Sequence, residues 1–250
     1  NGIIENGVAP KNIWAYDPSP RCMAWVHDRD INTAKSNDNA IAAAKIIIFC
    51  VKPNVLIELL ANIEEDLSDK LIVSVAAGIT TAMMTPHLPI NTAVVRCMPN
   101  TPIETRTGMT ALFPTAAVTN SQRMLVENIL TAVGQIVWVD TETDLDSVTA
   151  VSGSGPAYFF LMMESMISAA QALGLGEELS KQLVLQTSLG AAKMVNQKLD
   201  DPMELRKKVT SPAGTTEAAI KHFQAKGFDK IVEGAIKAAH RRSVELANEN

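Results

Sequence analysis

Residues 46–53 read Ile-Ile-Ile-Phe-Cys-Val-Lys-Pro, a run of six apolar residues that ends at a lysine and a proline. A strand with one face in water alternates apolar and polar side chains, whereas a strand covered on both faces is apolar throughout. The run is also rich in β-branched side chains, which are enriched in strands. Residues 46–51 are therefore predicted to form a strand inside a sheet that is covered on both faces.

The same pattern recurs along the first half of the chain, with helical patterns in between. The predicted strands cover residues 13–17, 46–51, 71–75, 92–97, 109–113 and 135–139. One predicted helix opens at residues 18–20 and runs to about residue 27, and others cover residues 55–63 and 121–133, with Thr80 as the cap of a further short helix. Strands that alternate with helices predict an α/β fold with a Rossmann-like, doubly wound, mostly parallel sheet. Ligands of such sheets bind beyond the carboxyl ends of the strands.

The second half of the chain lacks strand patterns. From about residue 144, Ala and Leu recur at spacings of three and four, which is the period of a helix. The predicted helices cover residues 156–173, 177–196, 202–209, 214–225 and 228–246, with Gly174 and Gly227 as C-terminal caps. We therefore expect a dinucleotide-binding domain at residues 1–145 and an all-α substrate and dimerisation domain at residues 146–250.

The overall composition argues against nucleic acid as a partner. The net charge is −5, and the 250 residues include only 6 Phe, 3 Trp and 2 Tyr. A nucleic-acid surface needs a basic stripe, and a single-strand binder also needs aromatic side chains on which bases stack. We expect neither in this protein.

Cysteine usage and hydropathy favour the cytoplasm. The three cysteines, Cys22, Cys50 and Cys97, are widely spaced and contain no C-x-x-C pair. Neither a disulfide framework nor a metal site is therefore expected. No apolar stretch is long enough to span a membrane, because Lys45 interrupts the best candidate. We expect a cytoplasmic protein with no membrane partner and no metal.

The phosphate-binding element of a dinucleotide fold is missing from its expected place. Such a fold begins with a strand, a G-x-G-x-x-G loop and a helix, within a unit of about 30 residues. Gly2 and Gly7 do not form this loop, and the two glycines of residues 153–155 lie in the helical half. We expect that the first strand and the glycine-rich loop precede the first residue and that residues 1–7 end the first helix. The alternative is a doubly wound fold without a phosphate loop.

Two segments stand out in the helical half. Residues 152–158 read Ser-Gly-Ser-Gly-Pro-Ala-Tyr and run into a long predicted helix. They form either a flexible joint between domains or a close approach of backbone to a ligand. Residues 209–216 read Val-Thr-Ser-Pro-Ala-Gly-Thr-Thr, directly before another predicted helix. Hydroxyls, a glycine and free N–H groups at a helix N-terminus make an anion site, although a well-capped helix start has the same sequence features.

Together, these two segments resemble the pyrroline-5-carboxylate reductase family. Four further segments match that family in the same order along the chain: residues 51–53, 76–78, 98–102 and 190–194. The resemblance therefore covers the whole chain. The sequence departs from the family at Ala213, where the family has Gly, and in lacking the phosphate loop.

The resemblance implies an enzyme of L-proline biosynthesis. Members of the family are oxidoreductases that act on a CH–NH group in the last step of the pathway. They transfer a hydride from NADPH or NADH to the cyclic imine of 1-pyrroline-5-carboxylate and release L-proline. They also form homodimers or larger homo-oligomers, and the apolar helix faces of residues 156–196 and 228–246 fit such an assembly.

The resemblance places the substrate on the second of the two segments. The carboxylate is expected on the backbone N–H groups of Gly214, Thr215 and Thr216, near the positive end of the helix dipole. The Thr216 hydroxyl is expected to hydrogen-bond the ring nitrogen while Ser211 supports the loop, so these two are the predicted catalytic residues. Val209 completes the predicted substrate-binding set.

The predicted cofactor is NADPH, with NADH as the alternative. The cofactor-binding residues that the resemblance implies are Asp17, Asn37, Val51, Lys52, Pro53, Ala76, Ala77 and Asn100. Asp17 ends the first predicted strand, where an acidic residue binds the adenosine ribose and repels a 2′-phosphate. Some family members carry Ser or Thr there, and Arg21 lies within reach of such a phosphate, so the cofactor preference stays open.

Two other functions remain open. Lys193 and Asn196 lie one helical turn apart, as in the catalytic Lys-x-x-Asn of β-hydroxyacid dehydrogenases, which share the two-domain plan. That alternative does not account for residues 152–158 or 209–216. The other alternative is a non-catalytic, dimerising protein with an incomplete nucleotide domain.

Overall fold

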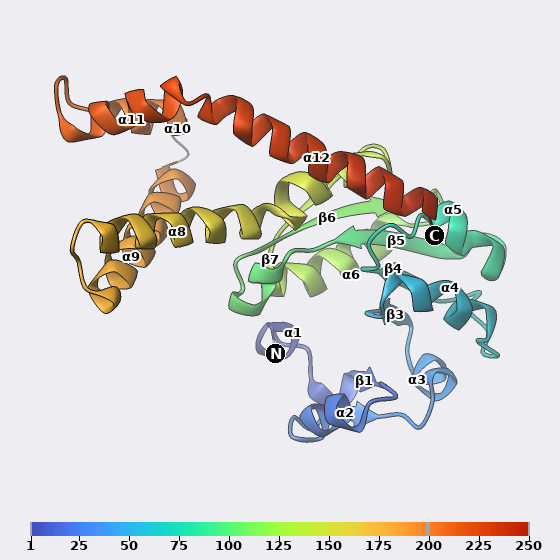
Figure 1. The fold of residues 1–250 in the computed structure, drawn as a ribbon. Helices are drawn as coiled ribbons and strands as arrows, with labels where there is room; N and C mark the ends of the chain where they lie inside the picture. Colours follow the sequence, from blue (N-terminus) through green and yellow to red (C-terminus); the bar gives the residue numbers. More distant parts are fainter. Residues whose placement is uncertain (1, 199–200, 250) are drawn as a thin grey trace. The chain divides into compact units, whose positions relative to one another are not determined.

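The computed structural model describes residues 2–198 and 201–249. Contacts divide the chain into two compact units (Figure 1). The first unit comprises residues 1–154 and 239–250, and the second comprises Gly155–Ala238. The domain boundary near residue 145 stays a prediction.

The first unit is built on a mostly parallel sheet, as predicted, but this sheet has five strands and the predicted strand at residues 13–17 lies outside it. Its strands are hydrogen-bonded in the order β3 (Ile46–Phe49), β4 (Leu71–Ser74), β5 (Ala93–Met98), β6 (Gly108–Pro114) and β7 (Gly134–Trp138). β3, β4 and β5 are parallel, β6 runs antiparallel to β5, and β7 is parallel to β6. Among the described residues, the parallel pair β1 (Trp14–Ala15) and β2 (Asn32–Thr33) forms a separate small sheet.

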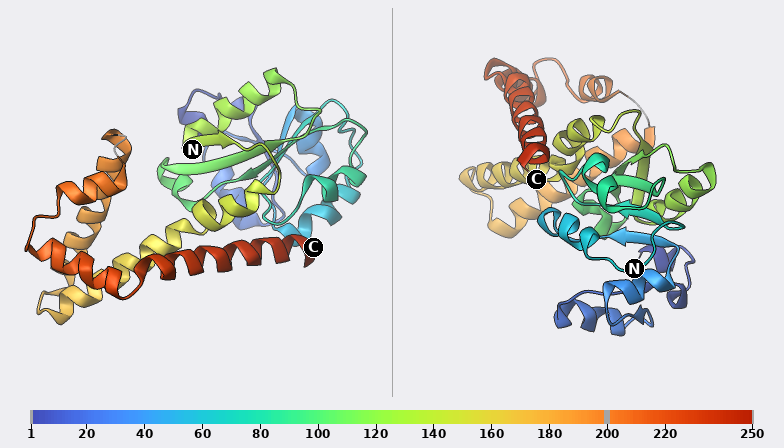
Figure 2. Two further views of the ribbon diagram at one scale, coloured as in Figure 1. Left: turned by 90° about the horizontal axis from the view of Figure 1, so that it is seen from above. Right: turned by 90° about the vertical axis from the view of Figure 1, so that its right-hand side faces the viewer.

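Alternate strand residues face two hydrophobic clusters, one on each side of the five-stranded sheet. One cluster contains Ile72 and Val94 and packs against α3 (Asn37–Ala43), α4 (Pro53–Ala61) and α5 (Thr81–Met84). The other contains Val73 and Val95 and packs against α6 (Asn120–Leu130). Figure 2 shows α6 on one side of the sheet and α4 on the other. Burial on both faces explains why the strand sequences are mostly apolar, with the buried Ser74 and Arg96 as polar exceptions in β4 and β5.

Short helices fill the connections of the first unit. They are α1 (Gly2–Glu5), α2 (Pro20–His27) and α7 (Asp144–Val148), with 3-10 turns η1 (Pro10–Asn12), η2 (Thr85–His87), η3 (Thr101–Thr105) and η4 (Thr131–Val133). Helix α1 agrees with the prediction of a helix within residues 1–7. Thr80 caps α5 as predicted, because its hydroxyl accepts a hydrogen bond from the Met83 N–H at 3.3 Å.

A π-helical turn, η5 (Thr149–Gly153), joins α7 to α8 (Gly155–Ala172). The Ser154 N–H donates to the Thr149 carbonyl, five residues back, at 2.8 Å. The start of the segment predicted as a joint or a ligand approach is therefore wound into a helix, and π-turns of this kind are frequent at functional sites. A Cβ added to Gly153 would lie 2.6 Å from the Met98 Cε, so this glycine lets the end of β5 approach the turn.

The second unit is all-helical, as predicted. It contains α8, α9 (Glu177–Lys198), α10 (Pro202–Lys208), α11 (Thr215–Ala225) and the first part of α12 (Phe228–Glu249). Gly174 and Gly227 have φ of +93° and +71°, which confirms them as left-handed C-terminal caps. Large apolar side chains on α8 and α9 are exposed, among them Phe159, Phe160, Leu161, Leu183 and Leu189. None of the helices in the described ranges is long and apolar enough to cross a membrane.

Candidate active site

Three of the predicted cofactor segments lie at one edge of the five-stranded sheet. β3, β4 and β5 are parallel neighbours, so their carboxyl ends share an edge. Residues 51–53 follow β3, residues 76–78 follow β4, and Asn100 follows β5. The Val75 N–H still donates to the Phe49 carbonyl at 3.3 Å, which keeps the first two segments adjacent. Ligands of doubly wound sheets bind at this edge.

The segment after β3 turns directly into α4. Pro53 is the first residue of this helix, a position where the missing N–H of proline breaks no helical hydrogen bond. Lys52 is the N-cap residue, and its exposed side chain makes no capping hydrogen bond. The Lys52 amine therefore makes no capping hydrogen bond at the start of α4.

The loop between β4 and α5 is held at both ends. At its start, the buried Ser74 hydroxyl accepts a hydrogen bond from the Ala76 N–H at 3.3 Å. Gly78 has φ of +76°, which favours glycine, and Ile79 is 1% exposed in the core. Ala77 is exposed. Ala76 is 2% exposed and belongs to the core, so of these two predicted cofactor residues only Ala77 presents its side chain at the sheet edge.

Both polar atoms of the Asn100 side-chain amide form hydrogen bonds with the backbone. Its Oδ1 accepts a hydrogen bond from the Met109 N–H at 2.8 Å, and its Nδ2 donates to the Ser152 carbonyl at 3.1 Å. The bond from the Met109 N–H shows which side-chain atom of Asn100 is the oxygen, because a backbone N–H requires an acceptor. Asn100 thus joins the end of β5, the start of β6 and the π-helical turn, and its contact with the cofactor stays a prediction.

The predicted adenosine-binding residues lie near β1 and β2. Asp17 follows β1, and its Oδ1 accepts a hydrogen bond from the Ser19 N–H at 2.7 Å, just before α2. Asn37 is the first residue of α3, directly after Ser36, which caps the helix by accepting the Asn39 N–H at 3.2 Å. The Asp17 carboxylate is exposed and keeps an acceptor for a ligand.

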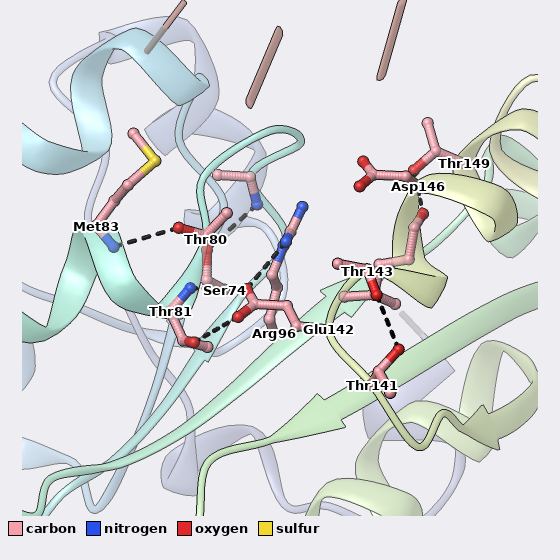
Figure 3. Close-up of polar contacts among 12 residues, drawn as sticks. Ser74, Thr80, Thr81, Met83, Arg96, Thr141, Glu142, Thr143, Asp146 and Thr149 are labelled. Carbon is pink, nitrogen blue, oxygen red and sulfur yellow. Dashed lines mark hydrogen bonds and ion pairs between the residues drawn. The ribbon is translucent and has the colours of Figure 1, made fainter. Parts of the chain in front are cut away.

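A buried ion pair joins β5, α5 and the chain that follows β7 (Figure 3). Arg96 Nη1 donates to Glu142 Oε1 at 2.9 Å. The same carboxylate accepts the Thr81 N–H at 2.7 Å and the Thr81 hydroxyl at 2.6 Å. The Arg96 side chain is 6% exposed and that of Glu142 is 20% exposed. Sequence reasoning missed this network, although an arginine inside the apolar run of β5 was a signal that it needs a partner.

A short loop in the second unit connects α10 to α11. Ala213 has φ of +56°, a left-handed conformation that is uncommon outside glycine. The Gly214 N–H donates to the Ser211 carbonyl at 3.1 Å, which closes the turn. Gly214 is the N-cap residue of α11, and no side chain caps this helix. The N–H groups of Thr215 and Thr216 thus have no capping partner within the described residues.

This geometry narrows the predicted anion site. Because the Gly214 N–H is used inside the loop, only Thr215 and Thr216 of the three predicted donors are available to a ligand. No side chain caps this helix start, since its N-cap residue is glycine, and binding of an anion there stays a prediction. The side chains of Val209 and Ser211 are exposed, and that of Thr216 is half-buried.

Glu217 stabilises the turn from the first turn of α11. Its Oε2 accepts a hydrogen bond from the Ala213 N–H at 3.1 Å and pairs with Lys221 Nζ at 3.1 Å. The hydrogen bond from Lys221, and after it the one from the Ala213 backbone, lowers the pKa of the Glu217 carboxyl. The side chain therefore stays ionised at neutral pH and holds Ala213 in place.

Other candidate groups lie on the surface. Lys193 and Asn196 are exposed on α9, and His222 is exposed on α11. Within the described residues, no cluster of three or more His, Cys, Asp or Glu side chains could hold a metal ion. Burial raises the pKa of the Cys97 thiol to about 12, so this cysteine behaves as a small apolar residue.

Two known families match different parts of the chain. The family described as pyrroline-5-carboxylate reductase dimerisation matches residues 142–246. The family described as NADP oxidoreductase coenzyme F420-dependent matches residues 1–78.

Individual relatives match along nearly the whole chain. The pyrroline-5-carboxylate reductase of Pseudomonas aeruginosa is 45% identical over 250 residues, which cover 99% of this chain and 92% of that protein. The Escherichia coli enzyme of the same name is 37% identical, with coverages of 98% and 92%. The structure of a pyrroline-5-carboxylate reductase from Coxiella burnetii matches with a TM-score of 0.93 at 36% identity and covers 98% of this chain and 92% of its own. The Plasmodium falciparum pyrroline carboxylate reductase with NADP bound matches with a TM-score of 0.87 at 31% identity and the same coverages.

Proposed function

The chain belongs to the pyrroline-5-carboxylate reductase family, and from that premise we propose how its residues bind substrate and cofactor. The reaction is hydride transfer from NADPH or NADH to the cyclic imine of 1-pyrroline-5-carboxylate, the last step of L-proline biosynthesis. The relatives extend over the whole chain, so a β-hydroxyacid dehydrogenase based on Lys193 and Asn196, or a non-catalytic protein, does not account for the sequence.

The substrate carboxylate binds, in this proposal, at the start of α11. The observation that carries the proposal is the uncapped first turn, in which the N–H groups of Thr215 and Thr216 lack an acceptor. The helix dipole adds partial positive charge at the same place, and together these features favour an anion. Glycine at position 214 fits the tight turn before the helix, since a Cβ there would lie 3.0 Å from the Ser211 carbonyl oxygen.

Thr216 orients the imine. Its hydroxyl lies in the same helical turn as the proposed carboxylate donors, and the carboxylate is attached to the ring carbon next to the nitrogen, so one residue can contact both groups. A hydrogen bond to the ring nitrogen fixes which face of the imine carbon accepts the hydride, and such positioning lowers the barrier. Ser211 acts through the loop, because its carbonyl holds the Gly214 N–H at 3.1 Å. Val209 supplies apolar contact beside the ring.

The cofactor is NADPH in this proposal, with NADH as the alternative. When bound, the nicotinamide supplies the hydride. The residues that would hold the cofactor are Asp17 and Asn37 at the adenosine end and Val51, Lys52, Pro53, Ala76 and Ala77 at the nicotinamide end, with Asn100 fixing the backbone beside them. The relative with bound NADP supports NADPH. The Asp17 carboxylate opposes a 2′-phosphate, so a comparison of the two cofactors decides the preference.

The assembly that we propose is a homodimer or a larger homo-oligomer in the cytoplasm, without a nucleic-acid or membrane partner. Phe159 and Leu161 on α8 are 68% and 63% exposed, which favours their burial against a second copy. The dimerisation match over residues 142–246 supports the same region. Three free cysteines fit a reducing compartment, and the net charge of −5 is unsuited to a nucleic-acid surface.

A steady-state assay of the intact chain with both cofactors tests the proposed site. Thr216→Ala is expected to lower kcat/KM for 1-pyrroline-5-carboxylate by about 10- to 100-fold, since it removes one orienting hydrogen bond. Thr210→Ala is the matched control, because that hydroxyl only donates to the Arg206 carbonyl at 2.6 Å. Undiminished activity in Thr216→Ala would remove the role assigned to this hydroxyl.

A further inference from the structure

The Glu142 carboxylate accepts three hydrogen bonds. Its Oε1 accepts from Arg96 Nη1 at 2.9 Å and from the Thr81 N–H at 2.7 Å, and its Oε2 accepts from the Thr81 hydroxyl at 2.6 Å. The Arg96 guanidinium and the Thr81 N–H can only donate, so they require the oxygen at this position, whereas the Thr81 hydroxyl can also accept. Alanine at position 142 removes all three contacts, whereas glutamine could keep them with its NH₂ group donating to the Thr81 hydroxyl.

The network is buried, which distinguishes it from the exposed ion pairs of the helices. The Arg96 side chain is 6% exposed, whereas the Lys181 and Glu178 side chains of a surface pair are 44% and 90% exposed. Water screens a surface pair, but it competes little with a pair inside the protein. Arg96 therefore fixes the position of the Glu142 carboxylate rather than merely neutralising it.

Through Thr81, the carboxylate fixes the far end of the loop after β4. Thr81 is the first residue of α5, and its N–H would otherwise lack a partner in the helix. At the near end, Ser74 Oγ holds the Ala76 N–H, and Arg96 is the register partner of Ser74 on the neighbouring strand. Figure 3 shows Ser74, Thr81, Arg96 and Glu142 gathered around this loop.

We propose that Glu142 is a positioning residue of the cofactor site: oriented by Arg96, it holds Thr81 and thereby fixes the loop of residues 75–80 against which the nicotinamide end of the cofactor binds. This inference rests on the proposed function, because the cofactor is assigned to Ala76 and Ala77 there. These contacts fix the loop before the cofactor binds, so cofactor binding does not have to order it.

Glu142→Ala tests the proposal, with Glu127→Ala as the matched control. Glu127 Oε1 accepts a hydrogen bond from Trp138 Nε1 at 2.6 Å, so the control removes a carboxylate from the same unit without touching the loop. In Glu142→Ala, the NADPH dissociation constant from fluorescence titration is expected to rise about tenfold, while KM for the imine stays within about twofold. Hydrogen exchange at the amides of residues 76–81 is expected to speed up by at least about tenfold, and the control should show neither change.

Thr81 provides a second pair of variants in case Glu142→Ala does not fold. Thr81→Val keeps the branched shape and loses the hydroxyl, whereas Thr81→Ser restores it. We expect Thr81→Val to weaken NADPH binding by about three- to tenfold and Thr81→Ser to stay within about twofold of the wild type. A merely structural role predicts a lower melting temperature with unchanged NADPH affinity.

Unchanged NADPH affinity and loop exchange in Glu142→Ala, or equal changes in Glu127→Ala, would overturn the positioning role. A wild-type chain that binds NADPH but does not reduce the imine would overturn the proposed function, while the binding comparison would still decide the role of Glu142. A wild-type chain that carries the expected first strand and glycine-rich loop and still binds no NADPH would overturn both.

Discussion

Replacing Thr215 with proline separates a ligand site from an ordinary helix start. Thr215 is the first residue of α11, so its N–H makes no hydrogen bond within the helix and proline fits there. The preceding residue, Gly214, has φ of −85° and ψ of 170°, the extended conformation that proline requires of its predecessor. The fold is therefore expected to accept the substitution while the N–H disappears.

The size of the effect follows from the bond that is lost. In the proposed complex, the Thr215 N–H donates to a carboxylate, and hydrogen bonds to charged groups contribute about 1.5–3 kcal/mol. KM for 1-pyrroline-5-carboxylate is therefore expected to rise by about 10- to 150-fold in Thr215→Pro. The melting temperature is expected to stay level or rise slightly, because proline restricts the unfolded chain.

Steady-state kinetics and thermal unfolding measure these two effects. Thr215→Ala is the first control, since it loses the hydroxyl and keeps the N–H. Glu177→Pro is the second, because it makes the same change at the first residue of α9, where the Gly176 carbonyl accepts the Ser180 N–H at 2.9 Å. An unchanged KM in a well-folded Thr215→Pro protein would refute the proposed carboxylate site.

Three other changes probe the loop, the sheet edge and the assembly. Ala213→Gly is expected to raise the free energy of unfolding by about 0.5–1 kcal/mol, because φ of +56° suits glycine better; denaturant titration without a gain would contradict the left-handed turn. Asn100→Asp is expected to cost about 1–3 kcal/mol, because a carboxylate oxygen would face the Ser152 carbonyl; an unaltered melting temperature at pH 7 would argue against this anchor. Light scattering is expected to show at least a dimer that Phe160→Glu weakens, since that side chain is 62% exposed on α8; a wild-type monomer would rule out the proposed assembly.

The parts of the fold with a continuous apolar pattern were predictable from the sequence. The runs at residues 46–51, 71–75 and 92–97 form β3, β4 and β5, because strands buried on both faces need apolar residues throughout. β2 escaped prediction, since the two residues Asn32–Thr33 have no apolar pattern. The π-helical turn also escaped it, because the Ser152 carbonyl finds its partner in Asn100, 52 residues away in the chain.

Part of the candidate site was also predictable from the sequence, and part was not. The loop before α11 was predictable, because its hydroxyls, its glycine and the helix start are contiguous in the sequence. The use of the Gly214 N–H inside the turn was not, since it depends on the left-handed conformation of Ala213. The Arg96–Glu142 pair joins residues 46 positions apart, and no local sequence pattern predicts such a contact.

The central claim is that the first turn of α11 binds the carboxylate of the substrate. Comparing kcat/KM for 1-pyrroline-5-carboxylate with that for 1-pyrroline, which lacks the carboxylate, tests it most directly in the wild type and in Thr215→Pro. If the claim is right, the wild type prefers the carboxylated imine and Thr215→Pro reduces this preference by at least about tenfold, with activity on 1-pyrroline retained. An identical preference in the two proteins would contradict it.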